Sequence, residues 1–124
     1  MDTLHKYELT LLQGWEEVHK KSQLSLWILL ALKDGKKHMT EIKQFIAVVT
    51  NCTISADDKS MYRALRRFHE SDMVSFEHKP SKGGPELKVY SLTDTGRRVL
   101  EYFTQRNIVN VFYKPEVETI IKKG

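Results

Sequence analysis

The sequence predicts a mainly α-helical domain of the α+β class, in which one two-stranded β-hairpin interrupts a series of helices. Three observations lead to this prediction. Apolar residues recur at steps of three and four through most of the 124 residues, as in amphipathic helices. Around 74–77 and again at 87–92, apolar and polar residues alternate instead, as in strands. The residues between these stretches, 80–85, are rich in proline, glycine and serine, which favour turns.

The composition is that of one compact, folded domain with a moderate excess of positive charge. The chain is 40% hydrophobic and 29% charged, and its formal net charge is +4. A chain of this length suits a single core with an additional helix at each end. The positive charge is concentrated centrally, because residues 59–67 include four basic side chains and no acidic one. This distribution permits a polyanionic partner without establishing one.

Three features predict a cytoplasmic protein with no membrane segment. Cys52 is the only cysteine, so no intramolecular disulfide can form, as is usual in a reducing compartment. Residues 1–6 lack the apolar core of a secretion signal. The longest apolar run, at 26–32, is too short to cross a bilayer.

Two helices are predicted before the turn signal at Asp34-Gly35. The first spans about 4–20, with Asp2 or Thr3 as its cap. Its apolar surface is broader than a small core needs, which predicts a partner. The second spans about 23–33 and is apolar nearly all round. It is therefore predicted to be the central core helix, with Trp27 in the core.

The next two helices precede the hairpin. The third is predicted to start after Thr40 and to bury one apolar stripe, formed by Ile42, Phe45, Ile46 and Val49. The fourth, about 57–71 with a cap at Ser55, has two contrasting faces. One face is apolar and consists of Met61, Leu65 and Phe68. The other positions include Lys59, Arg63, Arg66 and Arg67.

The C-terminal part of the chain returns to helical spacing after the hairpin. Thr93-Asp94-Thr95-Gly96 opens a fifth helix. Residues 108–113 fit a continued helix or a short strand equally well. Pro115 opens a last short helix, whose acids come early and whose bases come late, as the helix dipole favours.

Three helices followed by a hairpin constitute a winged helix-turn-helix. We therefore expect an N-terminal dimerisation helix at 1–22, a winged helix-turn-helix DNA-binding domain at 23–93, and a C-terminal dimerisation helix and tail at 94–124. A helix that is anchored by one face and carries arginines on the other suits the major groove of DNA. The recognition helix is then about 57–71, and the wing, 79–88, meets the backbone or the minor groove.

The residues that carry this pattern also resemble the PadR family of transcriptional regulators, from about Leu26 to Phe103. The resemblance rests on four segments: Ile28-Leu29-Leu30-Ala31-Leu32, Met39-Thr40-Glu41-Ile42, Ser60-Met61-Tyr62-Arg63-Ala64-Leu65-Arg66-Arg67-Phe68, and Tyr90-Ser91-Leu92-Thr93-Asp94-Thr95-Gly96. The family usually has glycine where this chain has Asp72, and its wing is typically richer in arginine. The resemblance implies a homodimeric repressor that binds a palindromic operator. It also implies dimerisation through the terminal helices and, as in some small members, a small hydrophobic effector.

Candidate DNA-binding residues follow from the two-faced helix and the wing. Arg63 is the best candidate for a base edge, because a guanidinium pairs bidentately with guanine, whereas Ser60 and Tyr62 suit phosphates. The full set is Lys59, Ser60, Tyr62, Arg63, Arg66, Arg67, Lys79, Lys82 and Lys88. A solvated charged face and a buried edge position for Tyr62 are the alternatives. Around the third helix, Lys36, Lys37 and Lys43 could clamp the DNA backbone or serve solubility alone.

A second set of candidates concerns a dimer interface or ligand pocket. Its members are Leu11, Trp15, Tyr102 and Phe103. The five histidines have no partner at a metal-ligand spacing, so neither a metal nor another cofactor is expected. No nucleophile elbow or phosphate loop is present, so we expect no enzyme. The alternative function is a winged-helix protein-interaction module without DNA binding, which the weak basicity of the wing, flanked by Glu77 and Glu86, favours.

Overall fold

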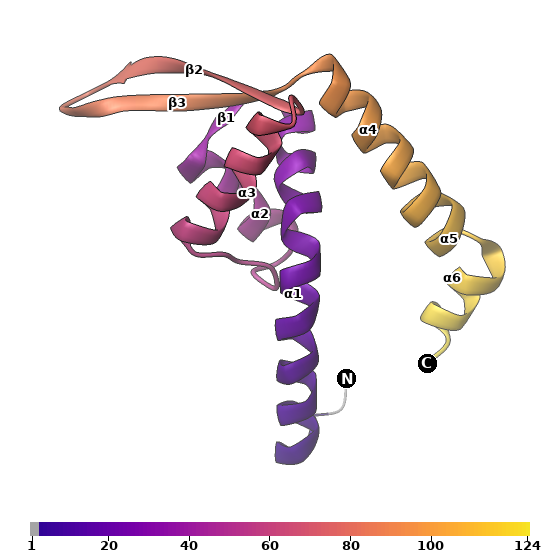
Figure 1. Ribbon diagram of the computed structural model, residues 1–124. Helices are drawn as coiled ribbons and strands as arrows, with labels where there is room; N and C mark the ends of the chain where they lie inside the picture. The colour runs from indigo at the N-terminus through magenta and orange to yellow at the C-terminus, as the bar shows by residue number, and fades with distance from the viewer. Residues whose placement is uncertain (1–2) are drawn as a thin grey trace.

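The computed structural model describes residues 3–124 and confirms a mainly helical fold with one small antiparallel sheet. Figure 1 shows a long N-terminal helix, α1, with two shorter helices packed beside its C-terminal half and a hairpin across the end of the bundle. A chain of C-terminal helices then descends on the other side, separated from the N-terminal half of α1.

The N-terminal helix α1 (Lys6–Asp34) is a single helix of 29 residues, so the prediction of two helices was wrong. The predicted break at residues 21–22 contains no proline or glycine. There Ser22 Oγ donates to the carbonyl oxygen of His19 at 2.9 Å, which a continuous helix accommodates. The N-cap is His5, whose N–H donates to Glu8 Oε1 at 2.9 Å. Thr3 therefore is not the cap, and Asp2 lies outside the described residues.

The starts of the two middle helices also differ from expectation. Helix α2 (Met39–Val49) begins one residue after its cap His38, whose Nδ1 accepts from the N–H of Glu41 at 3.4 Å. Helix α3 (Asp58–Glu70) is capped by Asp57 and not by Ser55. Asp57 Oδ1 accepts from the N–H of Ser60 at 2.7 Å, an aspartate cap of the usual kind.

The core lies where α1, α2, α3 and the helix after the hairpin, α4 (Asp94–Thr104), meet the base of the hairpin. Its largest fully buried side chains are Ile28, Ile42, Met61, Leu65, Val74 and Leu100. The predicted apolar stripe of α3 is therefore confirmed for Met61 and Leu65, whereas Phe68 is half-buried. Three predicted core positions differ from expectation: Trp27 and Phe45 are only half-buried, and Val49 is 48% exposed, so its predicted burial was wrong.

The hairpin consists of β2 (Val74–Ser81) and β3 (Gly84–Leu92), joined by a two-residue turn. Gly83 in this turn has a φ of +70°, a backbone conformation that favours glycine. A third strand, β1 (Lys37–His38), pairs with β3, so the sheet order is β1-β3-β2 and the predicted two-stranded sheet has three strands. Two residues are too few to show a period, which is why the sequence did not reveal β1.

The C-terminal segment continues as helix beyond the wing. It comprises α4 (Asp94–Thr104), a π-helical turn at Gln105–Val109, α5 (Asn110–Phe112) and α6 (Pro115–Lys122). Residues 108–113 thus belong mainly to helical structure, which resolves the two predicted alternatives. At the π-helical turn, the side-chain amide of Asn107 donates to the carbonyl oxygen of Phe103 at 3.0 Å. This side-chain hydrogen bond satisfies the carbonyl of Phe103 where the backbone hydrogen bonds change from the α-helical to the π-helical pattern.

The junction between the wing and α4 is bonded to the turn that follows α3. Thr93 Oγ1 accepts from the N–H of Gly96 at 2.9 Å and donates to the carbonyl oxygen of Asp72 at 2.6 Å. The N–H of Thr93 donates to the carbonyl oxygen of Met73 at 3.1 Å. Asp72 itself has a φ of +64°, which explains why glycine suits this position and why aspartate tolerates it.

Thr93→Val should lower the free energy of unfolding by about 1–2 kcal/mol, as measured by chemical denaturation. Valine has a similar shape but removes the hydroxyl group, so the N–H of Gly96 and the carbonyl of Asp72 both lose a partner. Thr93→Ser keeps the hydroxyl and serves as the matched control. If the valine variant unfolds at the same denaturant concentration as the wild type, the hydroxyl does not stabilise this junction.

Candidate nucleic-acid interface

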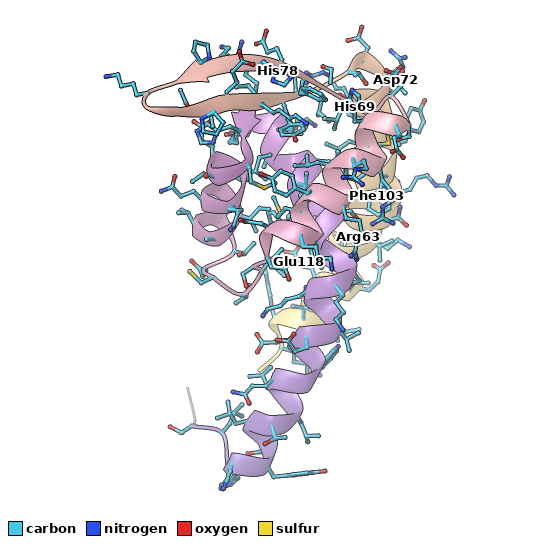
Figure 2. The ribbon with its side chains drawn as sticks, turned by 60° about the vertical axis from the view of Figure 1, so that its left-hand side comes forward. Arg63, His69, Asp72, His78, Phe103 and Glu118 are labelled. Carbon is cyan, nitrogen blue, oxygen red and sulfur yellow. The ribbon has the colours of Figure 1, made fainter. Side chains whose placement is uncertain are left out.

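The exposed face of α3 carries the basic residues that the sequence singled out. Met61, Ala64 and Leu65 are buried, whereas Lys59, Arg63, Arg66 and Arg67 are exposed. Figure 2 shows Arg63 on this helix. None of the three arginines makes an ion pair with a residue in the range 3–124. Their guanidinium groups are therefore available to a ligand.

Two polar residues on α3 differ in their exposure. Tyr62 is 52% exposed, so it is not the buried edge residue of the alternative interpretation. Ser60 is half-buried in the first turn, where its N–H donates a hydrogen bond to the side chain of the cap residue, Asp57. This hydrogen bond lowers the pKa of Asp57 below its usual value, and the hydroxyl of Ser60 contributes in the same direction. An ionised carboxylate at this position stabilises the N-terminus of α3 through the helix dipole.

The three wing lysines are in different environments. Lys79 Nζ lies 3.8 Å from Glu77 Oε1, an oxygen that also lies 3.7 Å from Lys36 Nζ. Lys88 Nζ lies 4.6 Å from the centre of the Phe76 ring, which is within cation–π range. Lys82, at the turn, has no ion pair with any described residue. Lys82 is therefore the wing lysine that can meet a phosphate without first leaving a partner.

The lysines near α2 are used within the protein. Lys37 Nζ donates to the carbonyl oxygen of Ala31 at 2.8 Å and to Asp34 Oδ2 at 2.9 Å, which closes the end of α1. Lys43 Nζ lies 2.6 Å from Asp58 Oδ1 and joins α2 to the start of α3. The residues of this second pair are far apart in sequence, so helical spacing could not reveal it. These contacts favour a structural role over a clamp on the DNA backbone.

A search of protein-family models places the arrangement of α3 and wing in a known family. The model of the transcriptional regulator PadR-like family matches residues 28–102, which is more than half of the chain. The chain belongs to this PadR-like family. It is accordingly a transcriptional regulator and not an enzyme. A search of curated proteins gave no match.

Solved structures of PadR-like proteins share the fold. A PadR-like transcriptional regulator from Bacillus cereus has 22% sequence identity and a TM-score of 0.65, over 84% of this chain and 96% of that one. A PadR-like transcription factor from Bacteroides fragilis has 23% identity and a TM-score of 0.62, over 87% and 96%. Bacillus subtilis PadR, in complex with operator DNA, has 24% identity and a TM-score of 0.59, over 64% of this chain and 45% of that one.

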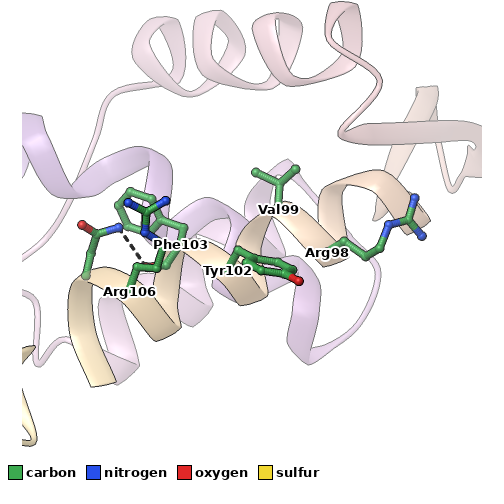
Figure 3. A pocket seen from close by; sticks show the side chains of 6 residues that line it. Arg98, Val99, Tyr102, Phe103 and Arg106 are labelled. Atoms are coloured by element: carbon green, nitrogen blue, oxygen red, sulfur yellow. Dashed lines mark hydrogen bonds between the residues drawn. The ribbon is translucent and has the colours of Figure 1, made fainter. Parts of the chain in front are cut away.

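The PadR-like chain has a second exposed surface, which is apolar and lies away from the α3 face. On α1, Tyr7 is 72% exposed and Trp15 is 75% exposed, and Leu11 is also exposed. On α4, Tyr102 is 73% exposed and Phe103 is 47% exposed. Figure 3 shows Tyr102 and Phe103 between Arg98 and Arg106 at a depression of about 600 Å³. The residues predicted for an interface or pocket therefore divide between α1 and α4.

A larger groove separates the C-terminal half of α1 from α4 and α5, with a volume of about 770 Å³. Trp27 and Leu30 line one wall, and Leu100 and Phe103 line the other. Phe68, near the end of α3, reaches its edge. Trp15 is not among the lining residues. The tryptophan that lines this groove, Trp27, lies on the same helix about three turns further on. This groove explains why Trp27 is only half-buried, because one side of its ring contacts the core and the other side faces the groove.

Residues 3–124 contain neither a membrane-spanning α-helix nor a metal-binding cluster. No α-helix in that range has the length and hydropathy needed for a membrane span. No cluster of three or more histidine, cysteine, aspartate or glutamate side chains in that range has a geometry suited to a metal ion.

Proposed function

We propose that this PadR-like protein is a homodimeric repressor that binds a palindromic operator in a sequence-specific manner. Helix α3 enters the major groove, and the wing meets the backbone or the minor groove. The observation that carries this proposal is that Arg63, Arg66 and Arg67 lie on an exposed face and make no ion pair within residues 3–124. The Bacillus subtilis relative in complex with operator DNA supports it. Because its target is operator DNA, we place the protein in the cytoplasm.

We assign the residues of the contact different roles. Arg63 reads a base edge, since it lies in the middle of α3 and can pair with guanine through two hydrogen bonds. Ser60, Tyr62, Lys59, Arg66 and Arg67 fix the helix on the phosphates. On the wing, Lys82 makes the first phosphate contact. Lys79 contacts DNA after it leaves Glu77, and Lys88 does so after it leaves the ring of Phe76.

The dimer that we propose covers the apolar surfaces of α1 and α4–α6. Exposed apolar side chains are clustered on both, and a small domain rarely leaves such a surface uncovered. A twofold dimer places two copies of α3 about one helical turn of DNA apart, so half-sites should be about 10 base pairs apart or a multiple of this. A small hydrophobic effector fits the groove beside Trp27, whose edge reaches Phe68 near the end of α3.

Selection of bound sequences from a pool of random duplexes tests the proposed function. A two-fold symmetric site should emerge, and its binding should weaken steeply with salt, by a slope of about −0.9 per neutralised phosphate. If no salt-dependent complex forms at micromolar protein, the protein does not bind duplex DNA. The alternative of a winged-helix interaction module, which the pairing of Glu77 with Lys36 and Lys79 favours, would then be preferred.

Arg63→Ala should weaken binding to the selected site by about 1–3 kcal/mol, as measured by fluorescence anisotropy, and should weaken binding to unrelated duplexes much less. The reason is that loss of a bidentate base contact affects only the sequence that offered it. Lys114→Ala, which removes one positive charge just before α6, is the control. Equal losses on specific and unrelated DNA would assign Arg63 to the phosphates.

A further inference from the structure

Three side chains that can be positively charged surround one aromatic ring between α3 and the wing. The ring centres of His69 and Phe76 are 4.8 Å apart, and His78 meets Phe76 edge-on at 5.5 Å. Lys88 Nζ lies 4.6 Å from the centre of the same ring. Figure 2 shows His69 at the end of α3 and His78 on the wing. We refer to His69, Phe76, His78 and Lys88 as the Phe76 cluster.

The Phe76 cluster lies on the face of the wing that turns toward α3. In the hairpin register, Phe76 is opposite Tyr90 and His78 is opposite Lys88, so these four side chains share one face. Val74 and Leu92 belong to the same face and are buried in the core. The face therefore continues outward from the core along the wing, and the contact between His69 and Phe76 ties it to α3.

The same surface continues along the recognition helix. His69 follows Arg66 by three residues and Tyr62 by seven, so the three side chains form one stripe along α3. All three are exposed. The stripe begins among the proposed DNA contacts and ends at the Phe76 cluster, so a phosphate backbone that follows α3 toward the wing passes over both histidines.

Charged and titratable side chains on the same elements lie around the Phe76 cluster. The charged and titratable neighbours on its elements are Arg66, Arg67 and Glu70 on α3, Asp72 in the turn, Glu77 and Lys79 on β2, and Glu86, Lys88 and Tyr90 on β3. Glu86 Oε2 lies 3.5 Å from His78 Nδ1. Glu77 is engaged with Lys36 and Lys79. No acidic group among the described residues lies within ion-pair distance of His69.

We propose that the Phe76 cluster binds a phosphate of duplex DNA, and that His69 and His78 take up protons when it does. This inference rests on the proposed function. Imidazoles change charge between about pH 5 and pH 8, and a phosphate beside them favours the charged form. Lys88 lies opposite His78 in the hairpin register and adds a third positive charge to the site, whereas Glu86, 3.5 Å from His78 Nδ1, has to give way to the phosphate. DNA binding is therefore coupled to proton uptake, and the affinity for duplex DNA rises as the pH falls.

Fluorescence anisotropy with the full chain and a labelled mixed-sequence duplex tests this coupling. The salt dependence of binding is measured at about pH 6 and about pH 8. Each imidazolium that neutralises a phosphate should steepen the logarithmic slope by about 0.9, so the wild-type slope should be up to roughly two units steeper at the lower pH. The His69→Gln/His78→Gln double variant should have the same slope at both values of pH. His19→Gln, on α1, should keep the wild-type response.

A fixed positive charge provides the complementary test. His78→Lys should bind duplex DNA at the higher pH with part of the affinity that the wild type gains at the lower pH. The inference is overturned if the wild-type slope does not change with pH, or if the double variant keeps the change. Both outcomes leave the proposed function intact, provided that the duplex is bound. Failure to bind at either pH would contradict the proposed function together with this inference.

Discussion

Gly96→Ala should abolish or severely destabilise the folded state, with a loss at or above the upper end of the 1–3 kcal/mol that is typical of overpacking. A Cβ on Gly96 would overlap the carbonyl oxygen of Met73 and lie 2.9 Å from its carbonyl carbon. This neighbour is backbone, and its oxygen already accepts from the N–H of Thr93. It cannot move aside as a flexible side chain does. Helix α4 would have to leave the turn after α3 and withdraw Leu100 from the core.

Gly14→Ala is the matched control for this substitution. Gly14 lies within α1, where an added Cβ meets nothing within 4 Å. Alanine there should stabilise the helix by about 0.5–1 kcal/mol, because it removes the entropic cost of glycine. Circular dichroism and thermal unfolding of the two variants measure the contrast. If Gly96→Ala melts at the wild-type temperature, the close approach between α4 and Met73 is not a real constraint on this fold.

The same junction shows why part of the family pattern could be recognised in the sequence but not explained from it. Thr93 and Gly96 belong to the segment that resembles PadR-like proteins, and local reading assigned them only to the start of a helix. In the structure, Thr93 also bonds the carbonyl of Asp72, and Gly96 leaves room for Met73. Both contacts join residues about twenty positions apart, which periodicity does not detect. The pattern therefore reports a tertiary contact between α4 and the end of α3.

Local periodicity was sufficient for the helices and the hairpin because each has its own repeat. The apolar stripe on α3 and the alternation in the wing were predicted correctly for this reason. It failed at residues 21–22, where lysine and serine interrupt the apolar spacing but do not end the helix. It also failed for β1, whose two residues become a strand only by pairing with β3. These errors arise where tertiary contacts decide the structure, or where residues with no strong local preference follow the structure of their neighbours.

For the candidate site, the sequence predicted which arginines would be exposed but not which residues of the protein the wing lysines would contact. The exposure of Arg63, Arg66 and Arg67 follows from their positions relative to the buried stripe of α3. The engagement of Lys79 with Glu77 and of Lys88 with Phe76 depends on the hairpin register and on rotamers. The wing therefore has less free positive charge than its composition suggests. This difference gives α3 the larger share of the proposed DNA contact.

The apolar surface of α1 leads to the second large effect. Trp15→Glu should convert the proposed dimer to a monomer and lower the affinity for a palindromic operator by a factor on the order of 10²–10⁴, because two linked recognition helices bind far more tightly than one. Trp15 is 75% exposed, and Tyr7 and Leu11 lie on the same helix. Aromatic side chains of this kind often dominate an interface. A glutamate there would place a charge in the apolar contact without disturbing the core.

Analytical ultracentrifugation and operator binding, measured on the same samples, distinguish this prediction from simple unfolding. Val48→Glu introduces the same charge at a residue of α2 that is 73% exposed, so its sedimentation should match that of the wild type. Trp15→Phe keeps an aromatic group and should remain dimeric. The Trp15→Glu monomer should still bind a single half-site weakly and with a salt dependence, since α3 is unchanged. If Trp15→Glu sediments as a dimer, the subunits associate through a different surface, and the role proposed for the N-terminal half of α1 is wrong.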